Sequence, residues 1–288
     1  MNKFGRAAFS FLLITAIGLL LVPSSRTASN TFAAQTGQGS LTPLQFEIEK
    51  QTQRLGSTET EERRDAVTRL RSMHHPAASR AALSGLNDPI AIIRATAASA
   101  ILSLPPGESA GYLIPLLVDK DEFVRREVAY ALGITHSQNA VVPLVARLNS
   151  DKKDSVRAAA AVALGELRAA SATLSLAEIL APGFESGASP SSKKSKKVKD
   201  LFLLRAAARS LGQIGNSAGV PALAAAVQDE KMPDDVRRES AFALGLIGDP
   251  AAIPALRNVV AARDPYLTEA ALGAIRKIER QAKRASSN

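Results

Sequence analysis

Histidines are the side chains in this sequence best suited to metal binding or acid–base chemistry, and there are three of them. His74 and His75 are adjacent and precede Pro76, whereas His136 stands alone. Metalloprotease helices instead place two histidines four residues apart, in the pattern His-Glu-x-x-His, which is absent here. Adjacent histidines before a proline are typical of an exposed turn. We therefore predict no catalytic residue and no metal ligand.

Other reactive groups are equally scarce. The sequence contains no cysteine, which excludes disulfides, thiolate zinc sites and cysteine nucleophiles. It has neither a P-loop nor a glycine-rich dinucleotide fingerprint. We therefore expect no cofactor and a function in binding. The net charge of +9 favours contact with anionic surfaces but does not specify a partner.

The first residues resemble an export signal. Lys3 and Arg6 precede an apolar run over 7–22 and then Pro23, the layout of a secretory signal peptide. The run is short for a transmembrane helix, which needs about 20 residues. We expect 1–23 to be a signal peptide or, alternatively, an uncleaved N-terminal anchor, with a fortuitous apolar stretch as the third reading. Residues 24–41, rich in Ser, Thr, Gln and Gly, predict a flexible linker, and the protein would be periplasmic or extracellular.

A repeated segment organises the rest of the chain. The stretch beginning Val156-Arg157-Ala158-Ala159 and ending in Gly165 recurs at spacings of 31, 31, 32, 47, 33 and 31 residues. Apolar residues precede and follow the arginine position at helical spacing, with alanines between, which predicts one buried helix face. The arginine column holds Arg63, Arg94, Arg125, Arg157, Leu204, Arg237 and Thr268.

A second apolar helix precedes each copy, so each repeat is predicted to be a helical hairpin. One hairpin cannot bury both faces, whereas stacked hairpins can. We predict an all-α fold, an α-solenoid of about seven stacked hairpins over 42–282, followed by a polar tail at 283–288. Four glycines follow the leucine column, where we expect them to end the helices: they are Gly133, Gly165, Gly212 and Gly245.

These features make the chain similar to the HEAT-repeat family, and in particular to its phycobilisome-lyase-like branch. The resemblance is carried by the Val-Arg-x-x-Ala-Ala-x-Ala-Leu-Gly pattern and by an aspartate six residues before Arg94, Arg125 and Arg157. It implies a structural Asp–Arg ladder between adjacent repeats, from which the last three repeats depart. HEAT-like deoxyhypusine hydroxylases bind iron through His-Glu pairs, and this sequence has no His-Glu dipeptide; lyase chemistry cannot be placed on named residues either.

One long spacing marks an insertion in the fifth repeat. Residues 182–199 are rich in Gly, Ser, Pro and Lys, which predicts a disordered basic loop. The loop is either solvated without a partner or in contact with an anionic polymer or membrane surface; a nuclear-import signal would conflict with export. No aromatic residue lies among its lysines, so we expect no sequence-specific nucleic-acid binding. The lysines are Lys193, Lys194, Lys196, Lys197 and Lys199.

The second helices of such solenoids line the concave face, and positions one and five after the arginine column share a face. This stripe carries aromatic and arginine side chains, which are enriched at binding hot spots. We predict that it binds an acidic or extended protein segment, against the alternative of a merely solvated face. Its candidate residues are Arg126, Tyr130, Arg205, Arg209, Arg238 and Phe242.

The sequence thus favours a non-catalytic protein-interaction scaffold with a protein partner of unknown identity. Two alternatives stay open at this point. One is an enzyme or accessory subunit related to the HEAT-like lyases and hydroxylases, an oxidoreductase by family similarity alone. The other is a protein that holds an anionic polymer or membrane through the basic loop.

Overall fold

The structure, a computed structural model, describes residues 41–181 and 200–286. The predicted leader, nearly all of the linker and the whole basic loop, with its five lysines, lie outside the described residues. Within the described ranges the chain forms fourteen α-helices, seven short 3-10 segments and no strand. None of these helices is both long enough and apolar enough to cross a bilayer.

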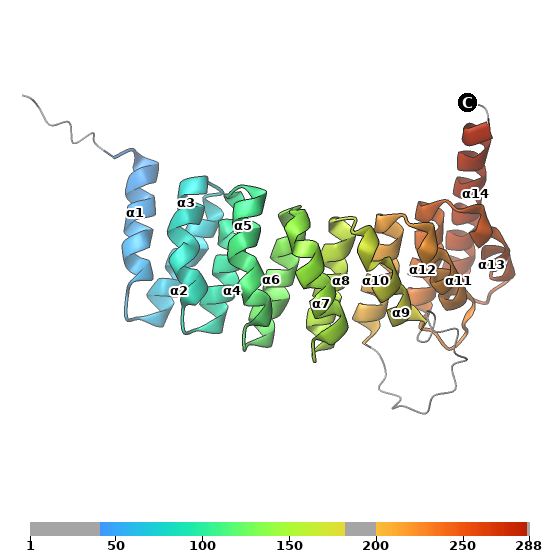
Figure 1. Cartoon of the computed structure of the whole chain (residues 1–288), viewed down its shortest axis with the longest axis horizontal. Helices are drawn as coiled ribbons and strands as arrows, with labels where there is room; N and C mark the ends of the chain where they lie inside the picture. The colour runs from blue at the N-terminus through green and yellow to red at the C-terminus, as the bar shows by residue number, and fades with distance from the viewer. Residues whose placement is uncertain (1–40, 182–199, 287–288) are drawn as a thin grey trace, which may run out of the picture. The chain divides into compact units, whose positions relative to one another are not determined.

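The helices pair in chain order into seven hairpins, as predicted (Figure 1). The second helices pack against one another in succession, and the first helices form a second layer beside them. The first helices are α1 (Pro43–Leu55), α3 (Pro76–Ala81), α5 (Pro106–Leu113), α7 (Val141–Ser150), α9 (Thr173–Leu180), α11 (Val220–Gln228) and α13 (Ile253–Asn258). The second helices are α2 (Thr60–Ser72), α4 (Ala91–Ala100), α6 (Glu122–Ile134), α8 (Asp154–Glu166), α10 (Leu201–Ile214), α12 (Asp234–Ile247) and α14 (Pro265–Ser286).

The stack continues across the insertion between α9 and α10. Helix α8 packs on α10 and α9 packs on α11, in the same way as the equivalent helices of other repeats. The added residues therefore connect two helices of one hairpin without displacing that hairpin from its neighbours.

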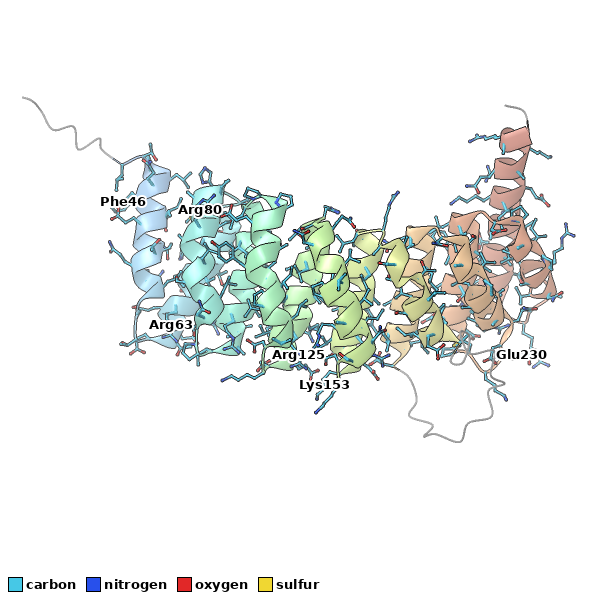
Figure 2. The ribbon with its side chains drawn as sticks, in the orientation of Figure 1. Phe46, Arg63, Arg80, Arg125, Lys153 and Glu230 are labelled. Carbon is cyan, nitrogen blue, oxygen red and sulfur yellow. The ribbon has the colours of Figure 1, made fainter. Side chains whose placement is uncertain are left out.

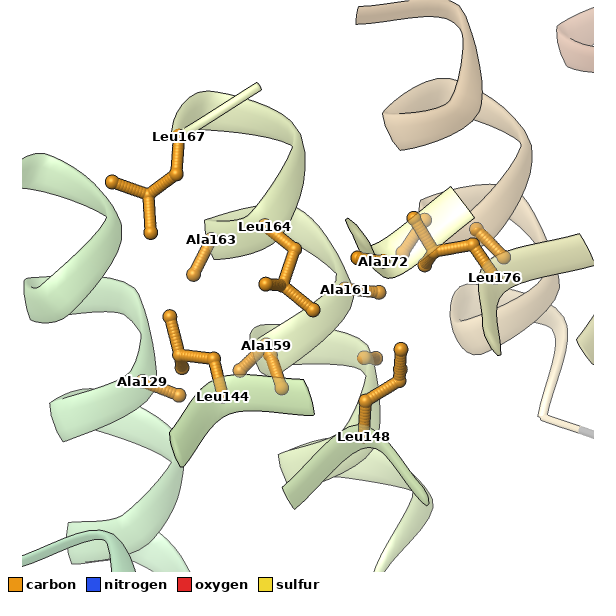
Figure 3. Close-up of a cluster of buried hydrophobic side chains, with 14 of the residues drawn as sticks. Ala129, Leu144, Leu148, Ala159, Ala161, Ala163, Leu164, Leu167, Ala172 and Leu176 are labelled. Atoms are coloured by element: carbon orange, nitrogen blue, oxygen red, sulfur yellow. The ribbon is translucent and has the colours of Figure 1, made fainter. Parts of the chain in front are cut away.

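The core is a continuous layer of alanine and leucine. In the middle of the stack, Leu144 and Leu148 of α7 meet Ala159 and Leu164 of α8, and all four side chains are fully buried (Figure 3). Small side chains let the helix axes approach closely. Leucines fill the space between the two layers, which explains how the chain builds a core with only 4% aromatic residues.

The glycine column has a different role from the one predicted. Gly133 and Gly245 lie inside α6 and α12, and the positive φ angles occur three residues further on, as at Gly248 with φ 80°. A Cβ on Gly133 would lie 2.8 Å from the Cα of Ala163, and one on Gly245 would lie 2.9 Å from the Cα of Ala274. The prediction that this column ends the helices is wrong, because its glycines are the points where successive second helices touch.

The Asp–Arg ladder implied by the resemblance is present in the first four repeats. Nε of Arg63 lies 2.7 Å from Asp88, Nε of Arg94 lies 2.8 Å from Asp119, and Nε of Arg125 lies 2.8 Å from Asp151. Arg63 and Arg125 lie along the same edge of the helical stack (Figure 2). Each rung joins the second helix of one repeat to the turn that begins the second helix of the next.

Candidate partner-binding face

The six predicted binding residues lie on three second helices. Each helix contributes two of them, four residues apart, so each pair shares one helix face. Helix α8 separates α6 from α10, and α10 packs directly on α12. The pairs are Arg126 and Tyr130 on α6, Arg205 and Arg209 on α10, and Arg238 and Phe242 on α12.

The α6 pair is half-buried, and Arg126 already has partners within its own helix. The Arg126 guanidinium lies over the Phe123 ring, 5.0 Å from its centroid, and forms an ion pair of 3.0 Å with Glu127. Burial raises the pKa of the Tyr130 hydroxyl, and the nearby Arg126 charge only partly offsets this. Tyr130 is therefore a neutral phenol at physiological pH, able to donate one hydrogen bond.

The α10 pair is the most accessible part of the stripe. Both arginine side chains are exposed. Arg209 lies 3.5 Å from Glu239 of α12, and Arg205 has no ion-pair partner within the described ranges. Exposed pairs of this kind contribute little stability, about 0–1 kcal/mol, so these cations are available to an incoming acidic group at small cost.

Arg238 is already engaged within the chain. Its Nε lies 2.6 Å from Asp264, its Nη1 lies 3.3 Å from Asp235, and its guanidinium lies 5.1 Å from the centroid of the Tyr266 ring. The hydrogen bond to Asp264 raises the pKa of Arg238, and it also lowers the pKa of the Asp264 carboxyl. This pair replaces the ladder rung that the last repeat lacks, and leaves Arg238 already paired within the chain.

Phe242 lies in a surface pocket between α12 and α14. Its side chain is 60% exposed, and the pocket has a volume of about 440 Å³. Sequence reasoning identified Phe242 but missed the α14 side of the pocket. The sequence feature that could have indicated the pocket is Gly273, which stands in the next repeat at the position that Phe242 occupies in its own. The other lining residues include Tyr266, Glu269, Arg276, Lys277 and Arg280.

The histidines occupy helix ends. The Nδ1 atom of His75 accepts a hydrogen bond of 3.1 Å from the Ala77 N–H at the start of α3. His74 and His136 adopt left-handed conformations with φ 46° and 53°, just after α2 and α6. Over residues 41–181 and 200–286 no group of three or more His, Asp or Glu side chains is placed to hold a metal ion.

Sequence reasoning missed one enzyme-like pattern, which the structure explains. Gly107-Glu108-Ser109-Ala110-Gly111 has the spacing of a hydrolase nucleophile turn, in which the serine is exposed between a strand and a helix. Here the segment lies within α5 and Ser109 is 1% exposed. Its Oγ lies 3.1 Å from the Ile101 carbonyl and 3.2 Å from the Leu104 carbonyl. Ser109 therefore joins two turns of backbone and is inaccessible to a substrate.

A surface hollow of about 700 Å³ lies where α6, α8 and α10 end. Polar side chains that line it form hydrogen bonds across the repeats. Nε2 of Gln213 donates to Glu166 at 3.1 Å, and Nε2 of Gln138 donates to the Leu167 carbonyl at 3.3 Å. These bonds link adjacent hairpins, so the hollow is explained by packing.

Several solved structures are similar to this chain, and one of them shares its fold with a TM-score above 0.5. The YibA protein of Escherichia coli is similar with a TM-score of 0.56, 18% identity and 82% of each chain covered. The complex of CpcE and CpcF of phycocyanin lyase from Nostoc sp. PCC7120 aligns with a TM-score of 0.48 and 22% identity, over 88% of this chain and 93% of that one. Human deoxyhypusine hydroxylase aligns with a TM-score of 0.38 and 20% identity, over 82% of this chain and 96% of that one.

Family and sequence comparisons give the remaining findings. A comparison with curated proteins finds no match. The model of the HEAT repeats matches residues 79–165 and 200–282, more than half of the chain. This match agrees with the stacked hairpins and the Asp–Arg ladder, and the chain therefore belongs to the HEAT-repeat family.

Proposed function

We propose that this protein is a non-catalytic scaffold that binds a protein partner along the exposed face of its second helices. The observation that carries the proposal is the exposed Phe242 ring in its pocket, on the same stripe as the exposed arginines of α10. Aromatic and arginine side chains dominate the binding energy of protein interfaces. Phe242 lines the same pocket as Tyr266, which is 66% exposed, and apolar side chains that cluster on a surface mark interaction sites, whereas single scattered ones do not.

Site-specific photocrosslinking tests this directly. A benzophenone amino acid replaces Tyr130 or Phe242 on the proposed face, and Val142 or Leu174 on the first helices α7 and α9. The two control side chains are also exposed, at 78% and 47%. We expect protein adducts from the first pair in cells, and weaker or absent adducts from the second. Adducts only from Val142 and Leu174 would place the interface on the opposite layer and contradict the proposal.

Export is part of the same proposal. Lys3, Arg6 and the apolar run that follows are the reason to propose a periplasmic or extracellular location, or attachment to the membrane by that segment. Cell fractionation with a C-terminal epitope tests it, since the tagged protein should leave the cytoplasm. Replacing two central leucines of the run with arginine should retain the protein in the cytoplasm.

A further inference from the structure

The pocket beside Phe242 exists because one side chain is missing from the stripe. Gly273 of α14 follows Phe242 of α12 in the same position of the repeat, so the space next to the aromatic ring is left open. A Cβ on Gly273 would meet a single atom within 4 Å, Nη2 of Arg276 at 4.0 Å. The other glycines inside second helices each meet a neighbouring helix at less than 3 Å.

Packing therefore does not explain Gly273. A glycine within an exposed helix costs about 0.5–1 kcal/mol relative to alanine, and no close approach requires it here. Its effect on the surface is to keep the floor of the pocket free of side-chain atoms. This is the second observation, besides the exposed ring, that points to an occupant.

The walls define what the occupant can be. Phe242 and Tyr266, 60% and 66% exposed, supply aromatic surface. The Tyr266 ring is held by Arg238, which is itself fixed by Asp264. Three cations, Arg276, Lys277 and Arg280, face a single carboxylate, Glu269. The lining thus combines aromatic surface with an excess of positive charge.

We infer that this pocket binds a protein segment in which one large apolar or aromatic side chain is flanked by acidic residues. The apolar side chain enters the space above Gly273 and contacts Phe242, and the acidic residues pair with Arg276 and Arg280. Glu269 accepts a main-chain N–H of the segment, a donor that the backbone of a nucleic acid does not offer. The inference rests on the proposed scaffold function and names the chemistry of its partner.

The test uses a plugged pocket with a matched control. In the Gly273→Trp variant the indole occupies the pocket, and the open space around the Cβ allows the helix to fold. Gly111→Trp adds the same side chain at an exposed, equally open position inside α5. Random twelve-residue peptides displayed on phage are selected against the full chain, and the selected peptides are then measured against both variants.

We expect the selected peptides to carry acidic residues around a Phe, Tyr, Trp or Leu. Their affinity should fall at least about tenfold with Gly273→Trp or with Arg276→Glu and Arg280→Glu together, and stay unchanged with Gly111→Trp. Circular dichroism confirms that each variant is folded.

Several results would overturn the inference. One is a selection that yields no peptides or only basic ones. Another is that the selected peptides still bind Gly273→Trp but no longer bind a variant with Arg205→Ser and Arg209→Ser. The scaffold function would then rest on another part of the stripe. A third is that the protein binds anionic vesicles or single-stranded DNA, and that Gly273→Trp abolishes this binding but leaves peptide binding unchanged. That result would assign the pocket to a different class of ligand.

Discussion

Arg94 and Asp119 are joined by two hydrogen bonds of 2.8 Å, from Nε and Nη2 of the guanidinium to the two carboxylate oxygens. The remaining nitrogen of Arg94 donates to the carbonyl of Asp88 at 2.8 Å. The Asp88 carboxylate in turn accepts a hydrogen bond from Nε of Arg63. Asp88 and Asp119 therefore each bind one arginine through the side chain and the next through the main chain, which locks these repeats in register. Asp151 binds Arg125 through its side chain, whereas Arg157 donates to the Leu148 carbonyl instead.

Arg94→Ala should destabilise the protein by about 3 kcal/mol, because it leaves a buried carboxylate without its partner. The side chains of Arg94 and Asp119 are only 7% and 9% exposed. The control is Arg64→Ala, since Arg64 forms an exposed pair with Glu61 and should contribute at most about 0.5 kcal/mol. Urea denaturation followed by circular dichroism measures both. Equal effects of the two substitutions would show that the ladder is dispensable.

The ladder should also make stability depend on acid pH. Burial alone would raise the pKa of Asp119, but the hydrogen bonds from Arg94 and the Asp121 N–H, with the Arg94 charge, outweigh it and lower the pKa. The pKa of the Asp151 carboxyl is lowered in the same way, by the hydrogen bonds from Arg125 and the Lys153 N–H. The contribution of each group is complete above the ordinary aspartate pKa of about 3.9 and is lost as the pH falls through the lower value of the folded state.

Asp119→Asn should therefore be less stable than the wild type at pH 7, and the difference in unfolding free energy should shrink as the pH falls below about 4. Denaturation curves at pH 7, 5, 4 and 3 provide the comparison. A difference that stays constant over this range would mean that Asp119 ionises at the same pH in both states.

Two glycines in consecutive repeats should respond in opposite directions to the same substitution. Gly245→Ala should destabilise by about 1–3 kcal/mol, because the new Cβ lies 2.9 Å from the Cα of Ala274. Gly273→Ala should stabilise by about 0.5–1 kcal/mol, because its Cβ enters open space. Thermal unfolding of the two variants is the measurement. A loss of stability with Gly273→Ala would give Gly273 a packing role and remove one support of the pocket inference.

The difference between these glycines also shows how far sequence reasoning reached. Alanine and leucine at helical spacing were enough to predict the hairpins and their stacking, since the same pattern recurs in each repeat. The contact role of Gly245 was missed, because a glycine near a helix end has the same sequence signature as a terminating glycine. The pair Arg238–Asp264 was missed because both residues are shifted from the ladder columns, and the pocket because it depends on an absent side chain.

Ser240→Ala should stabilise the protein by up to about 1 kcal/mol. The Ser240 hydroxyl is fully buried in α12 and has no hydrogen-bond partner among the described residues. The matched control is Ser210→Ala in α10, where the buried hydroxyl donates to the Ala161 carbonyl at 2.7 Å. That substitution should destabilise by about 1 kcal/mol. Parallel urea titrations distinguish the two, and a stability loss with Ser240→Ala would reveal a partner for its hydroxyl.

Left-handed residues that follow several of the second helices offer the last prediction. His136 and Arg168 hold left-handed conformations with φ 53° and 48° in the position that Gly215 occupies after α10 with φ 74°. A non-glycine residue in this conformation is strained by about 1–2 kcal/mol. Glycine removes the strain but gives the unfolded chain more conformational entropy, which lowers the free energy of unfolding by a smaller amount, about 0.4–1 kcal/mol. Arg168→Gly should therefore raise the unfolding free energy slightly, and Gly215→Ala should lower it by about 1 kcal/mol. Differential scanning calorimetry resolves both, and a gain from Gly215→Ala would contradict the strain assigned to this position.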